Sequence, residues 1–558
     1  MKSRIIIMWL AALLAVGMLA ACGGDSQKIS GDLAPDQTVR IRLDGEPPTI
    51  DPSLASFAGA AGITRNLFAT LLRFDPVTGS VEPYAAKETP TRDNGGVAQD
   101  GLTYTFHLRT EAVWEDGRPI TAKDFAYGIL RTLDPRVASY YGQTYYSSLI
   151  AGAGELAAAV DATPAEIDLL KSQVGVKAVD DATLEIKVAQ ASSTVNLLFA
   201  LWPTAAQRQD VVEDSGDISE SGWTEPGRLL ASGPFRLSQW EHGSRIVLEK
   251  NPRFWLEGLK PTLERIVFQI IEDENTAFAA YQRGDLDAAP IPLSALGGLS
   301  GSLQNEVQRV PLSTTFAVGF NHARLQFDTP RERQAFCASL DRQTLVQEIQ
   351  QGVGTVSTSW LPAGLTPYFE ADRGKKLAFD SKQAAAMLGA DKDGYSSAKL
   401  SFANVDPNLV QAEYIQGQWQ QNLGLSLKIE PLDPPAFGET FLSGNFDLVL
   451  IAFTEDYHHP ENWLLQWKSD SFMNLFGYQD SAFDDAVGKA MSADGDDSAV
   501  RLWRDAERIL IDEDAAICPL VSPETVWAVK PYVRDFVITG ADGIPGDFFY
   551  WKTAVLAR

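Results

Sequence analysis

Two adjacent carboxylates, Glu455 and Asp456, follow an apolar stretch of the chain and have aromatic neighbours such as Tyr457. The apolar stretch, residues 446–453, is rich in β-branched and aromatic side chains, which is typical of a strand buried on both faces. Open α/β sheets bind ligands beyond the carboxyl ends of such strands. From the local pattern alone, a solvated acidic turn remains the simpler interpretation. The rest of the chain favours a ligand site with an anionic, aromatic lining.

The chain lacks the common signatures of hydrolases and nucleotide-binding enzymes. It contains no H-E-x-x-H, no G-x-S-x-G and no G-x-x-x-x-G-K-[ST]. The sequence GLSGS at 298–302 misses the nucleophile elbow because its last residue is Ser. His458 and His459 adjoin the carboxylates, but adjacent side chains of an extended chain point apart and rarely reach one metal ion. We therefore expect no catalysis, no metal and no cofactor.

The composition indicates a large protein that does not bind nucleic acid. Its 558 residues are 45% hydrophobic, which suffices for a core divided over two or three domains. A net charge of −26 opposes binding to nucleic acid, whose phosphates require a basic face. The same acidity at most favours cationic or amine-bearing ligands.

Residues 1–21 have the organisation of a lipoprotein signal peptide. Basic residues precede a continuous apolar run over Ile5–Leu19, and the sequence LAAC, which ends at Cys22, resembles the lipobox of bacterial lipoproteins. The resemblance implies cleavage before Cys22, acylation of that cysteine, and export to the outer face or periplasmic side of the cell membrane. Residues 22–37 are small and polar, so we expect a flexible tether. A plain secretory signal with a coincidental cysteine is the alternative.

The two remaining cysteines, Cys337 and Cys518, lie in a helical pattern and in an apolar run. We expect both to be buried free thiols. One disulfide between them is the alternative in an exported protein. No other apolar run is long enough to span a bilayer, so we expect the mature body to be soluble.

Turn residues and amphipathic stretches downstream of residue 38 predict alternating helices and strands. Gly101, Gly117 and Gly284 stand where tight turns require a positive φ. The predicted elements, whose alternation indicates an α/β protein, are Thr38–Leu43, Ala60–Leu72, Thr121–Leu133, Glu332–Gln350, Gln411–Leu423, Leu425–Ile429, Ser498–Asp512 and Ile517–Val521.

Five stretches resemble the bacterial oligopeptide- and dipeptide-binding proteins, which are the family 5 extracellular solute-binding proteins of ABC transporters. The five stretches occur in the same order as in the family, and the match spans residues 38–540. The stretches are Val81–Asp134 (similar to vePyLA…DGltytFhLR…W.DG.PvTA.Df.y…dP), Ser232–Trp255 (sGPfrl.eW..g..ivLe.Np.yW), Tyr281–Asp287 (yraGeiD), Phe320–Arg342 (fN…pFdD.rvRqAl..aiDR) and Phe446–Pro460 (fD….gW.aDY.dP).

The resemblance implies an α/β, two-lobed periplasmic-binding-protein fold of type II, with an extra subdomain on the first lobe and two hinge crossings. The expected parts are lobe I at 38–75, 185–312 and 520–558, the extra subdomain at 76–184 and lobe II at 313–519. The crossings are expected near Pro311–Thr315 and Pro519–Val521.

The resemblance also implies how a ligand is held. Peptide-binding members sandwich an extended peptide between the lobes and pair its α-amino group with the Asp of the DY motif, here Asp456. Because successive side chains of an extended chain point to opposite sides, we expect Glu455 to be exposed and uninvolved. The expected main-chain partners are Ser56, Phe57, Ala58, Ala452, Phe453 and Thr454, with the side chains of Tyr457, Asn408 and Gln411 nearby.

Departures from the family pattern bear on the ligand. Phe453 replaces the family's Trp, Leu450 replaces an Arg of an oligopeptide binder, and no Arg or Lys stands at 408–411, where some dipeptide binders hold the ligand carboxylate. The α-amino anchor is kept while the carboxylate anchors are not. This favours a longer peptide, or a non-peptide cationic ligand, over a dipeptide.

These observations predict a monomeric, lipid-anchored receptor of an ABC importer. It captures a peptide in a cleft between its lobes and delivers it to permease and ATPase subunits in the membrane, without catalysis. A binder of a non-peptide solute on the same fold, such as a nickel chelate, a saccharide or another cationic compound, is the alternative. A secreted hydrolase is the remote alternative, which the absent motifs oppose.

Overall fold

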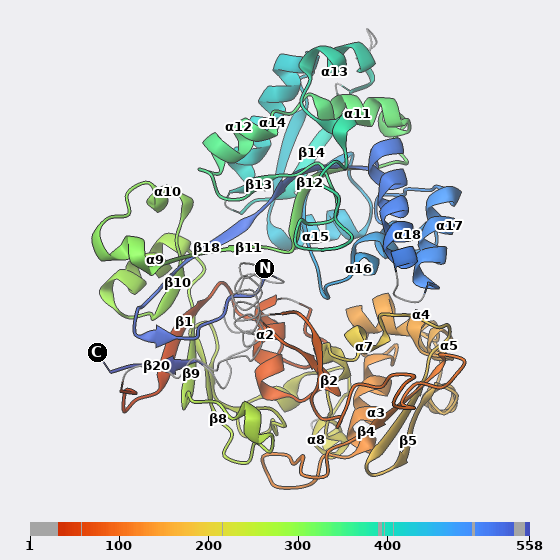
Figure 1. Ribbon diagram of the computed structural model, residues 1–558, viewed down its shortest axis with the longest axis vertical. Coiled ribbons are helices and arrows are strands. Elements are labelled where there is room, and N and C mark those ends of the chain that lie inside the picture. Colours follow the sequence, from red (N-terminus) through yellow and green to blue (C-terminus); the bar gives the residue numbers. More distant parts are fainter. Residues whose placement is uncertain are drawn as a thin grey trace, which may run out of the picture.

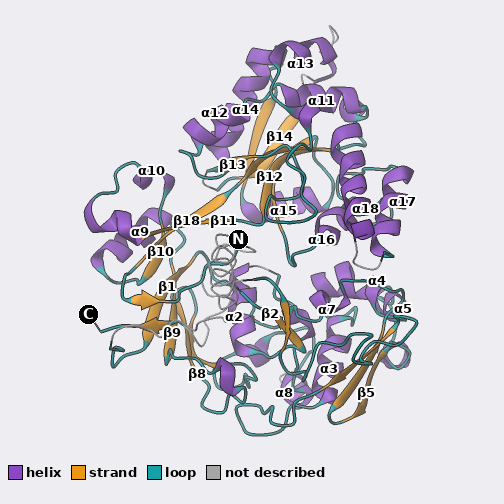
Figure 2. Ribbon diagram, in the orientation of Figure 1, coloured by secondary structure: helices purple, strands orange, loops and turns teal. Residues whose placement is uncertain are grey.

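The structure is a computed structural model that describes residues 32–540 and 553–557, except residues 57, 77, 215, 389–392, 396, 406 and 494–496. Two large sheets form two halves of the molecule, and a three-stranded sheet lies beside the first half (Figure 1). Figure 2 shows these sheets as separate groups of orange strands, each with purple helices next to it. The protein therefore has the two-lobed α/β architecture that the sequence predicts.

Lobe I is built on a seven-stranded sheet of order β11-β18-β10-β1-β9-β8-β7. Its strand β1 (Thr38–Leu43) is the predicted one and pairs in parallel with β9 and β10. Val39, Ile41 and Leu43 of this strand are buried in the core. The other elements of this lobe are β7 (Phe235–Glu241), β8 (Arg245–Lys250), β9 (Arg265–Ile270), β10 (Ala288–Pro290), β11 (Val307–Pro311), β18 (Glu524–Val529), β19 (Val533–Arg534), β20 (Ala554–Val555), α2 (Ala58–Leu67), α7 (Val195–Leu198), α8 (Gln209–Asp214), α9 (Glu274–Arg283), α10 (Leu293–Leu296) and the hairpin β2 (Leu72–Phe74) and β3 (Val81–Pro83).

The extra subdomain contains an antiparallel sheet of order β4-β6-β5, against which α3 packs. The predicted capping box is present, since the Thr121 backbone N–H donates to Asp124 Oδ2 at 2.7 Å. The expected end of this region at Leu184 is wrong, because β6 continues to Lys187 and pairs along its whole length with β4. The elements are β4 (Thr103–His107), β5 (Val176–Asp180), β6 (Thr183–Lys187), α3 (Ala122–Thr132), η1 (Gly142–Tyr146), α4 (Ser147–Leu149), α5 (Ala153–Ala157) and α6 (Pro164–Lys171).

Lobe II is built on a six-stranded sheet of order β13-β17-β12-β16-β14-β15, with a separate hydrophobic core. Its central strand β12 is buried at every position, as a strand covered on both faces must be. The elements are β12 (Thr314–Phe320), β13 (Thr355–Val356), β14 (Lys399–Ala403), β15 (Lys428–Leu432), β16 (Leu448–Thr454), β17 (Ile517–Ser522), α11 (Pro330–Ala338), α12 (Arg342–Thr344), α13 (Ser381–Leu388), α14 (Asn408–Leu423), α15 (Pro434–Leu442), α16 (Pro460–Leu464), α17 (Ser481–Met491) and α18 (Asp497–Arg508).

The chain passes between the two large sheets twice. It leaves β11 of lobe I and enters β12 of lobe II through Leu312 and Ser313, within the expected range. The expected second crossing at 519–521 is wrong, because β17 still pairs with β12 up to Val521. The chain leaves lobe II only at Pro523, between β17 and β18.

Two predicted helices are shorter than their patterns suggested. The helix expected over Glu332–Gln350 is divided, because the Asp341 carboxylate accepts from the backbone N–H groups of Gln343 and Thr344 and starts a new helix there. The helix expected over Ala60–Leu72 ends at Leu67. Cys337 and Cys518 are buried free thiols.

Candidate functional site

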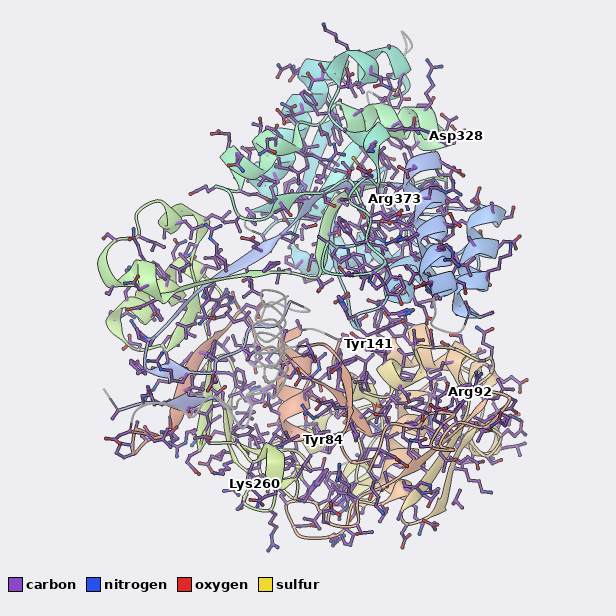
Figure 3. All side chains as sticks on the ribbon, in the orientation of Figure 1. Tyr84, Arg92, Tyr141, Lys260, Asp328 and Arg373 are labelled. Carbon is purple, nitrogen blue, oxygen red and sulfur yellow. The ribbon has the colours of Figure 1, made fainter. Side chains whose placement is uncertain are left out.

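The carboxylate of Asp456 lies between lobe II and the extra subdomain. It follows the end of β16, and its two oxygens accept hydrogen bonds from the hydroxyls of Tyr141 at 2.7 Å and Tyr145 at 2.6 Å. Tyr145 lies in η1. Tyr141 directly precedes η1 and lies at the boundary between the halves (Figure 3). The Asn462 amide completes the network, since its Oδ1 accepts from the Asp456 backbone at 2.9 Å and its Nδ2 donates to the Tyr145 hydroxyl at 2.8 Å.

Burial raises the pKa of the Asp456 carboxyl, and the hydrogen bonds from Tyr145, Tyr141 and Asn462 and the charge of Arg65 oppose this rise. Burial also holds the pKa of both tyrosines well above the usual range, so their hydroxyls remain neutral donors. Neutral donors solvate a carboxylate without cancelling its charge. The site is thus suited to a cationic group of a ligand.

A cavity of about 280 Å³ opens beside Asp456, and both lobes contribute to its lining. Arg65 of α2 stacks on the Trp202 ring at 4.5 Å and reaches the cavity from lobe I. The remaining lining residues are Phe74, Asp75, Pro76, Thr78 and Gly79 of the β2–β3 hairpin, Ser313 of the first crossing, Glu455, Tyr457 and His458 of lobe II, and Thr539 and Gly540. A charged and polar lining at a lobe boundary fits a solute-binding cleft.

The expectation that Glu455 is exposed is wrong. Only 5% of its surface is accessible, and it lines the same cavity as Asp456. Its carboxylate is 2.7 Å from His458 Nδ1 and accepts from Trp463 Nε1 at 3.2 Å. The hydrogen bond to Glu455 raises the pKa of His458. Strand alternation alone would leave Glu455 in solvent. The chain after β16 folds back and covers this side chain with Trp463.

The edge of β16 beyond Val449 is open in the part of the chain that the structure describes. On that side β14 pairs only with Leu448 and Val449, whereas β12 pairs with the whole strand. The Glu455 backbone N–H donates to Ser313 O at 3.1 Å, so strand alternation directs the backbone groups of Ala452 and Thr454 away from β12. This open edge can accept another extended chain.

The same alternation affects the expected set of main-chain partners. The backbone groups of Phe453 face β12, so Phe453 is unsuited to the role that the resemblance implies, whereas Ala452 and Thr454 are exposed and suited to it. Ser56 and Ala58 are exposed at the start of α2, and Phe57 lies outside the described residues.

Asn408 and Gln411 do not line the cavity at Asp456. They lie at the start of α14, next to the carboxyl end of β14, where Asn408 Nδ2 donates to Ala403 O at 3.0 Å. Gln411 is buried, and its Oε1 has no hydrogen-bond partner among the described residues. Tyr457, in contrast, packs against Tyr145 with ring centroids 5.8 Å apart and lines the cavity.

The sequence reasoning missed Arg65, Tyr141 and Tyr145. The signal that could have found the tyrosines is the repeated doublet at 140–141 and 145–146, a spacing that brings two hydroxyls to one face of a helical turn. Nothing in the local pattern distinguishes Arg65 from other surface arginines.

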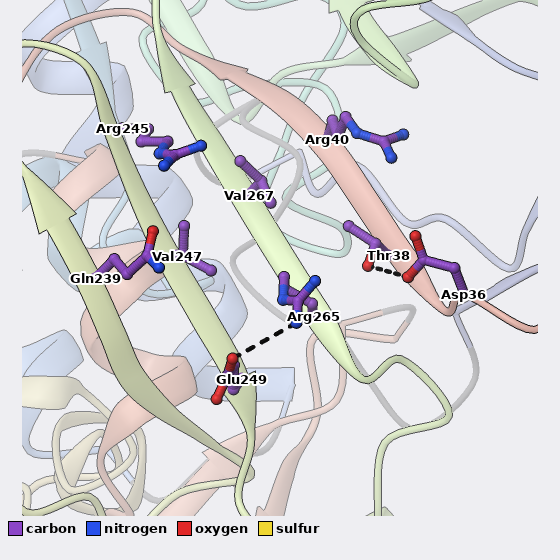
Figure 4. A pocket seen from close by; sticks show the side chains of 9 residues that line it. All are labelled: Asp36, Thr38, Arg40, Gln239, Arg245, Val247, Glu249, Arg265 and Val267. Carbon is purple, nitrogen blue, oxygen red and sulfur yellow. Dashed lines mark hydrogen bonds and ion pairs between the residues drawn. The ribbon is translucent and has the colours of Figure 1, made fainter.

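A second cavity of about 330 Å³ lies on one face of the seven-stranded sheet and does not share residues with the first (Figure 4). Three arginines line it, but Arg40 pairs with Asp287 at 3.3 Å, Arg245 with Glu241 at 2.6 Å, and Arg265 with Glu249 at 3.6 Å. This balance of charges indicates a solvated sheet face rather than an anion site.

Other expectations concern parts of the chain that the structure leaves undescribed. Cys22 and residues 1–21 lie outside the described residues. Within the described ranges, no three His, Cys, Asp or Glu side chains form a group that could hold a metal ion. Among the same residues, no helix has the length and apolar character needed to cross a bilayer.

The chain is similar to known proteins over most of its length. The periplasmic oligopeptide-binding protein OppA of Salmonella typhimurium is 28% identical over 565 residues, which cover 98% of each chain. The probable deoxycholate-binding periplasmic protein YgiS of Escherichia coli is 26% identical over 558 residues, also 98% of each chain. The solved structure of the Escherichia coli murein tripeptide binding protein MppA has a TM-score of 0.80 at 23% identity, and covers 94% of this chain and 100% of its own.

The family comparison covers most of the chain. Residues 80–474 match the family described as bacterial extracellular solute-binding proteins, family 5 middle. The matched range includes Asp456, the open edge of β16 and the tyrosines that meet Asp456. The chain therefore belongs to the family 5 bacterial extracellular solute-binding proteins.

Proposed function

We propose that this protein is the substrate-binding receptor of an ABC importer and captures an extended peptide between its lobes. The observation that carries the proposal is the position of Asp456, a carboxylate bound by neutral hydroxyls beside a cavity that both lobes line, directly after a strand with an open edge. Relatives whose names describe oligopeptide binding support a peptide as the ligand. The receptor performs no catalysis.

In this proposal the peptide α-amino group pairs with Asp456. The pair is a charge-assisted hydrogen bond, and it needs good geometry to offset the loss of water from both charges. The backbone of the peptide pairs with Ala452 and Thr454 at the open edge of β16, and with the segment around Ser56 and Ala58 across the cleft. Main-chain pairing gives affinity without reading side chains, as suits a receptor for many peptides.

The carboxyl end of the ligand has no matching basic anchor near Asn408 or Gln411. We therefore propose an oligopeptide rather than a dipeptide. A second candidate is a non-peptide solute, which the similarity to a probable deoxycholate-binding relative favours. A nickel chelate, a saccharide or another cationic compound belongs to this second candidate.

The test is the identity of the natural ligand. Mass spectrometry of small molecules released from gently purified protein, followed by calorimetric titration with a tri- to pentapeptide library, separates the two candidates. Peptides in the released fraction and among the binders support the first. A released non-peptide compound, with no peptide binding, contradicts it.

The cellular setting is part of the proposal. The mature protein is a monomer, exported and held at the membrane by acyl chains on Cys22, and it passes its ligand to permease and ATPase subunits. The family's description as extracellular and the sequence around Cys22 support this setting.

A further inference from the structure

Glu461 is a buried carboxyl group at the contact between the two halves of the molecule. It belongs to α16 of lobe II, and 4% of its surface is exposed. Its Oε1 accepts a hydrogen bond of 2.9 Å from the hydroxyl of Thr194, which directly precedes α7 in the other half. Its Oε2 is buried and has no hydrogen-bond partner among the described residues. A buried oxygen without a partner is costly on a charged group and much less so on a protonated one.

On the segment of lobe II around Glu461, His458 has a raised pKa, but its ring is paired with the Glu455 carboxylate and not with Glu461. Within the same segment, His459 Nδ1 accepts from the Glu461 backbone N–H at 3.2 Å. Burial lowers the pKa of His459 to about 3, so this ring is neutral throughout the range from pH 4.5 to 7. Its ring packs edge-on against Trp503 of α18. Asp456, on the same segment, has the same sign of charge as Glu461.

The residue of the other half that bonds this carboxyl is also uncharged, because Thr194 presents a neutral hydroxyl. The Tyr457 hydroxyl donates to Glu461 Oε1 at 3.5 Å, a weak contact. Burial raises the pKa of Glu461 to about 7, and the hydrogen bonds from Thr194 and Tyr457 oppose the rise.

Part of this environment exists only while the halves touch, because Thr194 belongs to the half opposite Glu461. Separation of the halves removes the Thr194 contact and admits water, so the pKa of Glu461 should fall toward its ordinary value of 4.5. Between these two values the carboxyl is charged in the separated state and protonated in the joined state. A proton is therefore a ligand of the joined state.

We propose that closure of the lobes on a ligand takes up one proton at Glu461, so that the receptor captures its ligand more tightly in acidic than in neutral surroundings. The inference rests on the proposed function, since it requires the lobes to close on a bound solute. Affinity is gained in full below pH 4.5 and is lost as the pH rises through 7. The expected change is about tenfold per pH unit within that window and several hundredfold at most.

The test counts protons. The tightest binder of the peptide library is titrated calorimetrically at about pH 6 in two buffers of different ionisation enthalpy, and the difference gives the protons taken up. Wild type should take up close to one, and Glu461→Gln none. The variant should also bind at neutral pH about as tightly as wild type does in acid, because Gln is neutral throughout. Glu257→Gln, at a carboxylate that is 86% exposed, should behave as wild type.

Thr194→Val provides a second, milder test. It removes the donor that opposes the raised pKa, so the loss of affinity should move to higher pH. The ligand's α-amino group titrates near about pH 8, outside the window. Tight peptide binding with no proton uptake, and one pH profile for wild type and both variants, would overturn the inference. Absence of peptide binding at every pH would instead overturn the proposed function.

Discussion

At the scale of single residues, Asp456 is a charged acceptor held by neutral donors, Tyr141 and Tyr145, and therefore open to a cation. Asp456→Asn should weaken peptide binding by about 2–5 kcal/mol, because a buried ammonium is left without its partner. N-acetylation of the peptide should add little further loss in this variant, since both changes remove the same pair. Calorimetry on the four combinations measures this coupling.

The control for this cycle is Asp485→Asn, because Asp485 is exposed on α17 and does not line the cavity. It should leave the affinity unchanged. Glu455 is unsuited as a control, since it is buried and paired with His458. Additive losses from acetylation and Asp456→Asn would show that Asp456 does not bind the ligand amine.

The Glu455–His458 pair gives a prediction about pH. Because the hydrogen bond to Glu455 raises the pKa of His458, the pair stabilises the fold in full below the ordinary histidine pKa of about 6.5, and this stabilisation is lost as the pH rises through the higher folded value. Glu455→Gln should return the His458 pKa toward its ordinary range. NMR titration of the ring measures it, and His242, paired with Glu46 elsewhere, should titrate unchanged. An unaltered His458 titration would contradict the assignment.

At the scale of elements, the open edge of β16 is the feature on which main-chain recognition depends. Ala452→Pro removes an N–H that faces this edge, so peptide affinity should fall by about 0.5–1.5 kcal/mol with little change in Tm. Phe453→Pro is the matched control, since its N–H faces β12, and it should lower Tm instead. Calorimetry and thermal unfolding separate the two effects. Equal affinity of Ala452→Pro and wild type would show that the ligand does not pair with this edge.

At the scale of the whole molecule, two crossings at Leu312–Ser313 and Pro523 join lobes with separate cores. Such a construction permits open and closed states that differ by a few kcal/mol, with the ligand favouring the closed state. Small-angle scattering should therefore show a smaller radius of gyration on saturation with peptide. A radius that does not change under saturation would count against lobe closure.

The anchor belongs to the same scale. If Cys22 carries the acyl chains, Cys22→Ala should leave the protein unprocessed or free of the membrane, because no acyl chain is then attached to hold it there. Labelled palmitate and membrane fractionation measure this, with Cys337→Ala as the control whose labelling should not change. Equal labelling of Cys22→Ala and wild type would place the lipid elsewhere.

Much of the architecture could be predicted from the sequence because it depends on local patterns. The alternation of Thr38–Leu43, the apolar run that became β16 and the capping residues before α3 specify their elements within a few residues. The order of five motifs indicated two lobes and a site at Asp456. The prediction that the chain crosses between the lobes at 519–521 was wrong, because the sequence of an apolar strand does not indicate where its pairing with a neighbouring strand ends.

Only the tertiary structure decided what surrounds the carboxylates. Tyr141 and Tyr145 lie 315 and 311 residues from Asp456 in the sequence, and Thr194 lies 267 residues from Glu461. Whether Glu455 is exposed and whether Glu461 is charged depend on these distant neighbours, because desolvation and hydrogen bonding are set by what lies nearby in space. Sequence periodicity specifies which face of an element is apolar. It does not show which other element that face packs against. The chemistry of this cleft depends on that packing, because it brings the side chains of distant elements together.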